Sequence, residues 1–146
     1  MERVPCVFCR IIAGELPSLT FYGDEQTVAI MDLRQPGWPH VAHVLVLPRE
    51  HVESLDGLSS RTASALMDTT VKVSRAVRQA LQPDGYSLWQ SNGEVAGQEV
   101  PHVHMHLLTR TGGDGLLQIY GTPPEEPPLE ALAPLANRLR HQLDPP

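Results

Sequence analysis

The segment "HVHMHLL", residues 102–108, places a histidine at every second position in a chain that has only seven histidines. Side chains of a β-strand alternate between the two faces of a sheet. A strand at this point would therefore project three imidazoles from one face, while Val103, Met105 and Leu107 turn toward the other. The sequence predicts a strand with a row of imidazoles on one side and the protein core on the other.

Three interpretations fit this row of imidazoles. The histidines could form a metal site, since imidazole is a common ligand of zinc, copper, iron and nickel. One of them could instead act as a nucleophile supported by its neighbours. The third interpretation is a strand with only a polar, half-exposed face. The last interpretation is disfavoured because the histidines fill three of five positions and follow a glycine-bearing loop. One ion held by all three histidines ranks last, since the outer pair of an extended strand is about 13 Å apart.

The rest of the chain alternates short extended segments with helical patterns. Residues 20–22 and 27–32 are predicted strands joined by a turn, and the apolar run 43–48 and residues 86–91 are two more. A helix is predicted over 59–81, where apolar residues recur at i, i+3, i+4 and i+7, and a short helix is predicted over 7–13. This order lacks a regular βαβ alternation and predicts an α+β fold with an antiparallel sheet.

The chain of 146 residues is interpreted as a single domain, 1–146, long enough to bury a core. Residues 111–146 are expected to form a proline-rich loop and then a C-terminal helix. Pro134 either starts that helix or kinks it. The helix is predicted from leucines at helical spacing, namely Leu132, Leu135, Leu139 and Leu143.

Composition excludes some classes of partner. A net charge of −6 argues against sequence-independent binding of nucleic acid, which relies on Lys and Arg against phosphates. No apolar run approaches the roughly 20 residues that span a bilayer, and no signal peptide is visible. We therefore expect a cytoplasmic protein with neither nucleic-acid nor membrane partners.

Three segments of the chain resemble the histidine triad family. The stretch "NGEVAGQEVPHVHMHLL" resembles its signature, in which Asn-Gly and Gly-Gln pairs precede His-x-His-x-His and two apolar residues. "CVFCRIIAGELPSLTFYGDEQTVAIMD" resembles the family's N-terminal segment, and "HVLVLPREHVESL" resembles its strand with a Pro-basic-x-His ending. The resemblance implies a roughly five-stranded antiparallel sheet with two helices, usually in a homodimer. It also implies hydrolysis or nucleotidyl transfer at the α-phosphate of AMP-containing substrates, as in nucleoside phosphoramidases and dinucleoside polyphosphate hydrolases.

By this resemblance His104 is the nucleophile, His106 and His43 hydrogen-bond the phosphate oxygens, and Gln98 helps to bind the phosphate or the leaving group. A neutral imidazole is a competent nucleophile near pH 7 when its other nitrogen carries the proton and is held by an acceptor. Attack would form a covalent nucleotidyl-histidine, from which water would release the nucleoside monophosphate. The alternative is a nucleotide-binding or scaffolding dimer without useful turnover.

The resemblance also places a purine nucleotide, or a conjugate of one, over the N-terminal half of the chain. Asp32 matches the family's ribose-binding acid, and Asn92 matches a residue near the phosphate. Backbone amides around Glu99 and Val100 are expected as further phosphate donors. The base pocket would be lined by apolar residues, each of which would equally suit a core: Val7, Phe8, Ile11, Ile30, Leu33 and Leu45.

Cys6 and Cys9 form a CxxC motif at the start of the chain. A thioredoxin-type motif would follow a strand, and none precedes this one, so half of a metal site is the better interpretation. A branch of the family, similar in this respect to galactose-phosphate uridylyltransferases, adds the histidine after the Pro-basic stretch and the first triad histidine. Those residues are His51 and His102 here, and the resemblance implies a closed, structural zinc site. A pair of buried free cysteines is the alternative.

Two positions depart from the family's pattern. Glu99 stands where Ser or Thr often follows Gly-Gln, so the leaving group stays open among an amine, a second nucleotide, sulfate and a sugar phosphate. Ala42 precedes His43 where Gly is usual, and a shifted alignment would make His40 the family residue. We favour His43 because it directly precedes the strand.

Overall fold

The computed structural model describes residues 6–116 and 124–143, which fall into two compact units within Met1–Leu116 and Leu117–Pro146. The first unit contains a five-stranded antiparallel sheet, which confirms the predicted α+β class. Among the described residues, no helix has the length and apolarity that crossing a membrane requires. The structure is of one chain, so the homodimer stays a prediction, as does the treatment of 1–146 as one domain.

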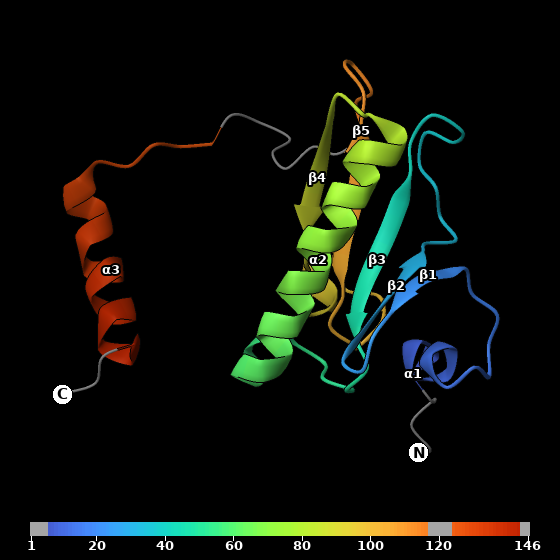
Figure 1. The fold of residues 1–146 in the computed structure, drawn as a ribbon. Coiled ribbons are helices and arrows are strands. Elements are labelled where there is room, and N and C mark those ends of the chain that lie inside the picture. Colours follow the sequence, from blue (N-terminus) through green and yellow to red (C-terminus); the bar gives the residue numbers. More distant parts are fainter. Residues whose placement is uncertain (1–5, 117–123, 144–146) are drawn as a thin grey trace. The chain divides into compact units, whose positions relative to one another are not determined.

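The sheet has the strand order β1-β2-β3-β5-β4, and every neighbouring pair is antiparallel (Figure 1). Across β3 and β5, Leu45 pairs with His106, and across β4 and β5, Trp89 pairs with the same histidine. The strands are β1 (Thr20–Gly23), β2 (Thr27–Met31), β3 (His43–Pro48), β4 (Gly85–Trp89) and β5 (Met105–Arg110).

Helix α2 (Ser60–Leu81) lies across one face of the sheet (Figure 1). The Ser59 side chain accepts a hydrogen bond from the Thr62 amide and so caps its first turn. The helix ends at Gln82, whose φ of 46° places it in the left-handed region, and Pro83 follows. The core beneath it consists of alternate strand residues and one stripe of the helix: Ala29, Val44, Val46, Leu66, Val73, Val77, Val103, Met105 and Leu107.

Helix α1 (Val7–Ile12) contributes to a second cluster, made with the other side chains of β2 and β3. Phe8 is its one buried residue, with 6% exposed. The cluster comprises Phe8, Val28, Ile30, Leu45 and Leu47, with Cys6, Ile11, Ile12 and Val100 at its edge. Because the central strands are covered on both faces, their sequences are nearly continuous apolar runs.

The histidine segment follows the predicted alternation but not the predicted strand. Val103, Met105 and Leu107 all lie in the core cluster under α2, as expected. Strand β5, however, begins only at Met105. Before it, the Val103 amide donates to the Val52 carbonyl, and His102 Nε2 donates to the Pro48 carbonyl at 2.8 Å. The backbone and ring of this segment therefore bond to residues at and beyond the end of β3 instead of continuing the ladder.

The described part of the second unit ends in helix α3 (Leu129–Leu143). Pro134 lies inside this helix, five residues after its first residue, rather than at its first turn. None of its residues is buried. The first unit also contains two short 3₁₀ turns, η1 (Leu55–Gly57) and η2 (Glu94–Ala96).

Candidate functional site

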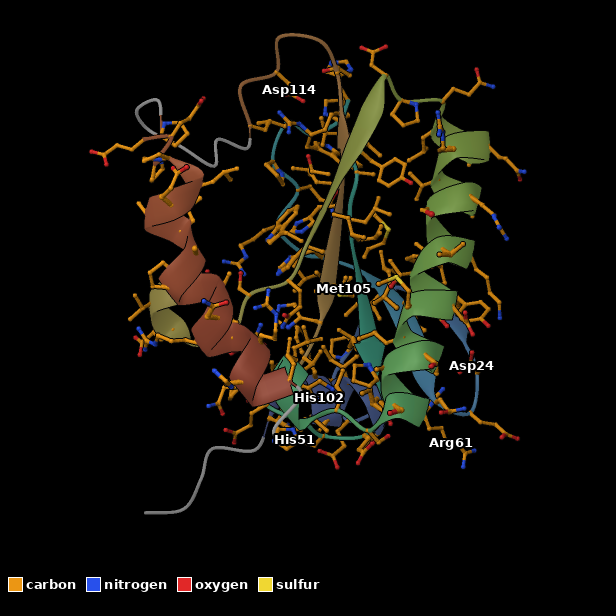
Figure 2. All side chains as sticks on the ribbon, turned by 90° about the vertical axis from the view of Figure 1, so that its left-hand side faces the viewer. Asp24, His51, Arg61, His102, Met105 and Asp114 are labelled. Atoms are coloured by element: carbon orange, nitrogen blue, oxygen red, sulfur yellow. The ribbon has the colours of Figure 1, made fainter. Side chains whose placement is uncertain are left out.

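Four potential metal ligands from separate parts of the chain meet at one point. Cys6 and Cys9 flank the first turn of α1, His51 follows β3, and His102 precedes β5. One ligand atom from each lies within 4.8 Å of all the others. Figure 2 shows His51 and His102 close together near one end of the sheet.

The spacing of these atoms fits a tetrahedral ion. His102 Nδ1 lies 3.5 Å from Cys6 Sγ, 3.6 Å from Cys9 Sγ and 3.4 Å from His51 Nδ1, and Cys9 Sγ lies 3.3 Å from His51 Nδ1. Tetrahedral zinc has bonds of about 2.3 Å to sulfur and about 2.0–2.1 Å to nitrogen, which separate two nitrogens by about 3.3–3.4 Å and a nitrogen from a sulfur by about 3.5–3.6 Å. The donor set of two sulfurs and two nitrogens is also typical of zinc.

The tautomer of His102 suits a ligand. Its ring is fully buried, and Nε2 faces the Pro48 carbonyl, which only accepts hydrogen bonds. Nε2 therefore carries the proton, and the lone pair of Nδ1 points into the Cys6 and Cys9 cluster. Burial lowers the pKa of His102 and keeps it neutral. Burial, followed by contact with the Cys6 thiol, raises the pKa of the Cys9 thiol, and a bound cation would reverse that effect.

A cavity of about 240 Å³ lies beside this cluster, between α1, β2, β3 and the residues before β5. Its lining combines apolar side chains with ionisable ones. All six residues predicted for the base pocket line it, together with five residues predicted for ribose and phosphate: Val7, Phe8, Ile11, Ile30, Leu33 and Leu45, and Asp32, Glu99, Val100, His104 and His106.

The orientation of His104 is set by the backbone of His102, whose ring belongs to the group of four potential metal ligands. His104 Nδ1 lies 2.6 Å from the carbonyl oxygen of His102 and donates a hydrogen bond to it. Because the ring is neutral with one proton, Nε2 keeps its lone pair. Burial lowers the pKa of His104 and favours this neutral state. The Phe8 ring makes T-shaped contacts with both imidazoles, with its centroid 5.0 Å from that of His104 and 5.9 Å from that of His102.

His43 joins two residues of the cavity lining, His106 and Asp32, in a chain of polar contacts. His43 Nε2 lies 3.0 Å from His106 Nδ1, while His43 Nδ1 lies 3.3 Å from an Asp32 carboxylate oxygen and 3.1 Å from the Arg34 carbonyl. Burial, helped by the neighbouring His104 and His43, lowers the pKa of His106 to about 3. His43 is not among the lining residues of the cavity. Its predicted contact with phosphate stays a prediction, while its contact with His106 is direct.

Gln98 and Asn92 also lie outside the cavity wall. Gln98 accepts from the Gly93 amide at 2.7 Å and donates to the Glu53 carbonyl at 2.6 Å, while Asn92 accepts from the Leu55 amide at 2.7 Å. Both side chains tie the loop before β5 to the segment after β3, and Gly93 with φ 87° allows the turn between them. Their predicted phosphate-binding roles stay predictions.

Two side chains that contact predicted site residues were not themselves predicted, namely Arg34 and Trp89. Arg34 lines the cavity and pairs with Glu99 at 2.8 Å, and both side chains are about two-thirds exposed, 69% and 65%. Trp89 stacks on His106 from the neighbouring strand. A search for aromatic residues in the predicted strand 86–91 would find Trp89, but its partner depends on the β4–β5 register, which the sequence does not specify.

Comparison with known proteins gives a consistent result. The HIT domain family matches residues 13–113. The adenosine 5'-monophosphoramidase HNT1 of Candida albicans is 29% identical to this chain over 146 residues, which cover 97% of this chain and 93% of that protein.

Solved structures agree with the fold. A crystal structure of a HIT family member from Bacillus subtilis has a TM-score of 0.87 and 33% identity, and covers 98% of this chain and 100% of its own. A zinc-bound histidine triad family protein from Mycobacterium smegmatis has a TM-score of 0.68 and 30% identity, with 96% of each chain covered. The resemblance inferred from the sequence motifs is confirmed.

Proposed function

Since this chain belongs to the HIT domain family, we propose that it hydrolyses or transfers nucleotides at the α-phosphate of purine nucleotide conjugates, through a covalent intermediate on His104. The observation that carries this proposal is the hydrogen bond from His104 Nδ1 to the His102 carbonyl. That bond fixes the tautomer whose Nε2 lone pair is free, on a residue that lines the cavity. The name of the Candida albicans relative, an adenosine 5'-monophosphoramidase, supports the same chemistry.

The reaction has two balanced steps. In the first, the lone pair of His104 Nε2 forms a bond to the α-phosphorus while the bond to the leaving group breaks, and the leaving atom keeps that electron pair and takes up a proton. In the second, a water oxygen attacks phosphorus, the P–N bond breaks and its electron pair returns to Nε2. The water loses a proton, and the nucleoside monophosphate is released.

The His102 carbonyl stabilises both the free and the modified ring. Once Nε2 is bonded to phosphorus, the imidazole carries a positive charge, and its Nδ1–H donates a stronger hydrogen bond to the carbonyl. The second triad partner, His106, lines the same cavity, which supports a role for it at the phosphate oxygens. We assign it the stabilisation of charge that develops there.

The apolar wall is suited to a purine base. Phe8, Ile30 and Leu45 come from α1, β2 and β3, and give a broad surface without charged groups. Asp32 lines the same cavity, and we assign to its carboxylate the hydrogen bonds from the ribose hydroxyls. The fixed direction from base to ribose would carry the α-phosphate toward His104.

The Cys6, Cys9, His51 and His102 cluster would hold a zinc ion. When bound, zinc supplies a fixed point that joins the start of α1 to the segments after β3 and before β5. All four ligand positions come from the protein, so substrate would not reach the metal. His102 would then hold the nucleophile through its carbonyl while its ring is anchored, which makes the role of the metal structural.

His104→Ala tests the proposed function. AMP affinity is measured by calorimetry, and AMP release from an adenosine 5'-phosphoramidate is measured by chromatography, with the exposed His40→Ala as matched control. We expect a loss of turnover of roughly 1,000-fold or more, with AMP affinity changed only a few-fold. Turnover that survives in His104→Ala contradicts the mechanism. A wild-type protein that binds AMP but cleaves no member of a panel of adenylylated compounds is instead a nucleotide-binding protein.

A further inference from the structure

Trp89 forms a three-ring stack with two histidines of the site. Its indole is parallel to the His106 ring, with an interplanar angle of 1° and centroids 4.6 Å apart. It also stacks on His43 at 5.5 Å and 17°, and the two imidazoles stack on each other at 5.2 Å and 18°. The residue is half-buried, directly opposite His106 in the β4–β5 register, and is not among the lining residues of the cavity.

The protons of the two imidazoles can be counted from their neighbours. His43 Nδ1 faces the Arg34 carbonyl and an Asp32 carboxylate oxygen, both acceptors, so it carries a proton. The 3.0 Å contact between His43 Nε2 and His106 Nδ1 holds one further proton. In the neutral pair that proton belongs to His106 Nδ1, because His43 already carries its single proton. His106 Nε2 is then a bare acceptor.

A bare acceptor cannot hydrogen-bond an ionised phosphate oxygen, which is itself only an acceptor. Binding of phosphate at His106 therefore needs one additional proton, taken up from solvent by the His43–His106 pair. With that proton the pair is cationic, and His106 Nε2–H becomes a donor to the ligand.

The surroundings of His106 do not favour that charge in the absence of a ligand. Its pKa is lowered first by burial, then by His104 and His43, and also by Arg34, while Glu99 acts in the opposite direction. Asp32 is the second carboxylate near the pair, and it contacts His43 Nδ1. An aromatic face within about 6 Å attracts a cation, most strongly when both are partly desolvated, and the Trp89 centroid is within that distance of both imidazoles.

We propose that Trp89 is a positioning residue: its indole face stabilises the protonated His43–His106 pair and so makes His106 a hydrogen-bond donor to bound phosphate. The ligand in this inference rests on the proposed function, because it is the phosphate of a nucleotide. Two consequences follow. Nucleotide binding is accompanied by proton uptake, and that uptake depends on an aromatic ring at position 89.

The test compares wild type with Trp89→Leu, which removes the ring, and Trp89→Phe, which keeps an aromatic face. Trp38→Phe is the matched control, since Trp38 is 72% exposed. AMP binding is followed by calorimetry at pH 7 in buffers of different ionisation enthalpy, and the nitrogen shifts of His106 are followed by NMR in the complex. Wild type and Trp38→Phe are expected to take up close to one proton per AMP and to show a charged His43–His106 pair.

Trp89→Leu is expected to take up a smaller share of a proton and to bind AMP roughly two- to thirty-fold more weakly, the range for a cation–π contact. Trp89→Phe should recover most of both. Equal uptake and equal nitrogen shifts in wild type and Trp89→Leu overturn the inference. If wild type binds no AMP, the proposed function fails, and the His106 titration of ligand-free protein decides the inference: a lower midpoint in Trp89→Leu supports it, and an unchanged midpoint overturns it.

Discussion

Replacement of Phe8 by leucine tests whether one ring supports the core and the nucleophile together. Phe8 is 6% exposed and makes T-shaped contacts with the rings of His102 and His104. It packs in the cluster of Val28, Ile30, Leu45 and Leu47. Complete truncation of a buried Phe costs about 3–5 kcal/mol. Leucine keeps part of the apolar volume, so we expect Phe8→Leu to lower the free energy of unfolding by about 1–2 kcal/mol.

The same change should affect turnover. Without the Phe8 ring, the His104 imidazole is less firmly held. A displacement of this imidazole by about 1 Å costs up to about 100-fold in rate. We expect kcat to fall by roughly tenfold, with AMP affinity reduced because the same ring lines the base wall.

Urea unfolding and steady-state kinetics measure the two effects, with Phe21→Leu as the matched control. Phe21 is 48% exposed on β1, and its replacement should change stability by no more than about 0.5 kcal/mol. If Phe8→Leu is no less stable than Phe21→Leu, or if its kcat equals that of wild type, this account of Phe8 is wrong.

Three other perturbations have defined outcomes. Elemental analysis of the double variant Cys6→Ser, Cys9→Ser should find no zinc, and the variant should melt at a lower temperature than wild type. Added chelator should lower the melting temperature of wild type but not of the variant. Zinc retained by the variant would contradict the assigned ligands. Glu99→Gln should raise the ratio of kcat/KM for substrates with anionic leaving groups to kcat/KM for substrates with amine leaving groups by roughly two- to tenfold at low salt. The reason is that the change removes a negative charge from the cavity lining and releases Arg34 from its ion pair. An unchanged ratio would exclude this role of Glu99. The pKa of His106 is lowered in the folded state, so the unfolded chain protonates first as pH falls below about 6.5 and stability decreases toward lower pH. His106→Gln should reduce that slope by up to about 1.4 kcal/mol per pH unit between about pH 6 and pH 4, measured from urea midpoints, whereas an unaltered slope would show that His106 does not contribute.

Much of the fold follows from local patterns that the sequence displays directly. The alternation of Val103, Met105 and Leu107 identified the core face, and the apolar run 43–48 is strand β3 as expected. The helix 59–81 is recognisable because its apolar residues recur at helical spacing. Such signals depend on neighbouring residues only, so they are readable from one sequence.

Site residues that belong to a sequence motif could be predicted, whereas contacts between side chains and distant segments of the chain could not. The resemblance identified eleven residues that line the cavity, which the structure brings together, but not Arg34. It did not show that Gln98 and Asn92 bond to backbone at 53 and 55, because those contacts join loops far apart in the chain. For the same reason Trp89 was not recognised as a neighbour of His106: strand register is a property of the assembled sheet.

The central claim is that His104 Nε2 bonds to phosphorus during turnover. The most direct measurement is peptide mass spectrometry of protein quenched during the reaction with an adenylylated substrate, under alkaline conditions that preserve a P–N bond. The account predicts one adenylyl group, located on His104 and absent from His104→Ala. Rapid product formation with His104 unmodified at every time point, or with the adenylyl group on another residue, would contradict it.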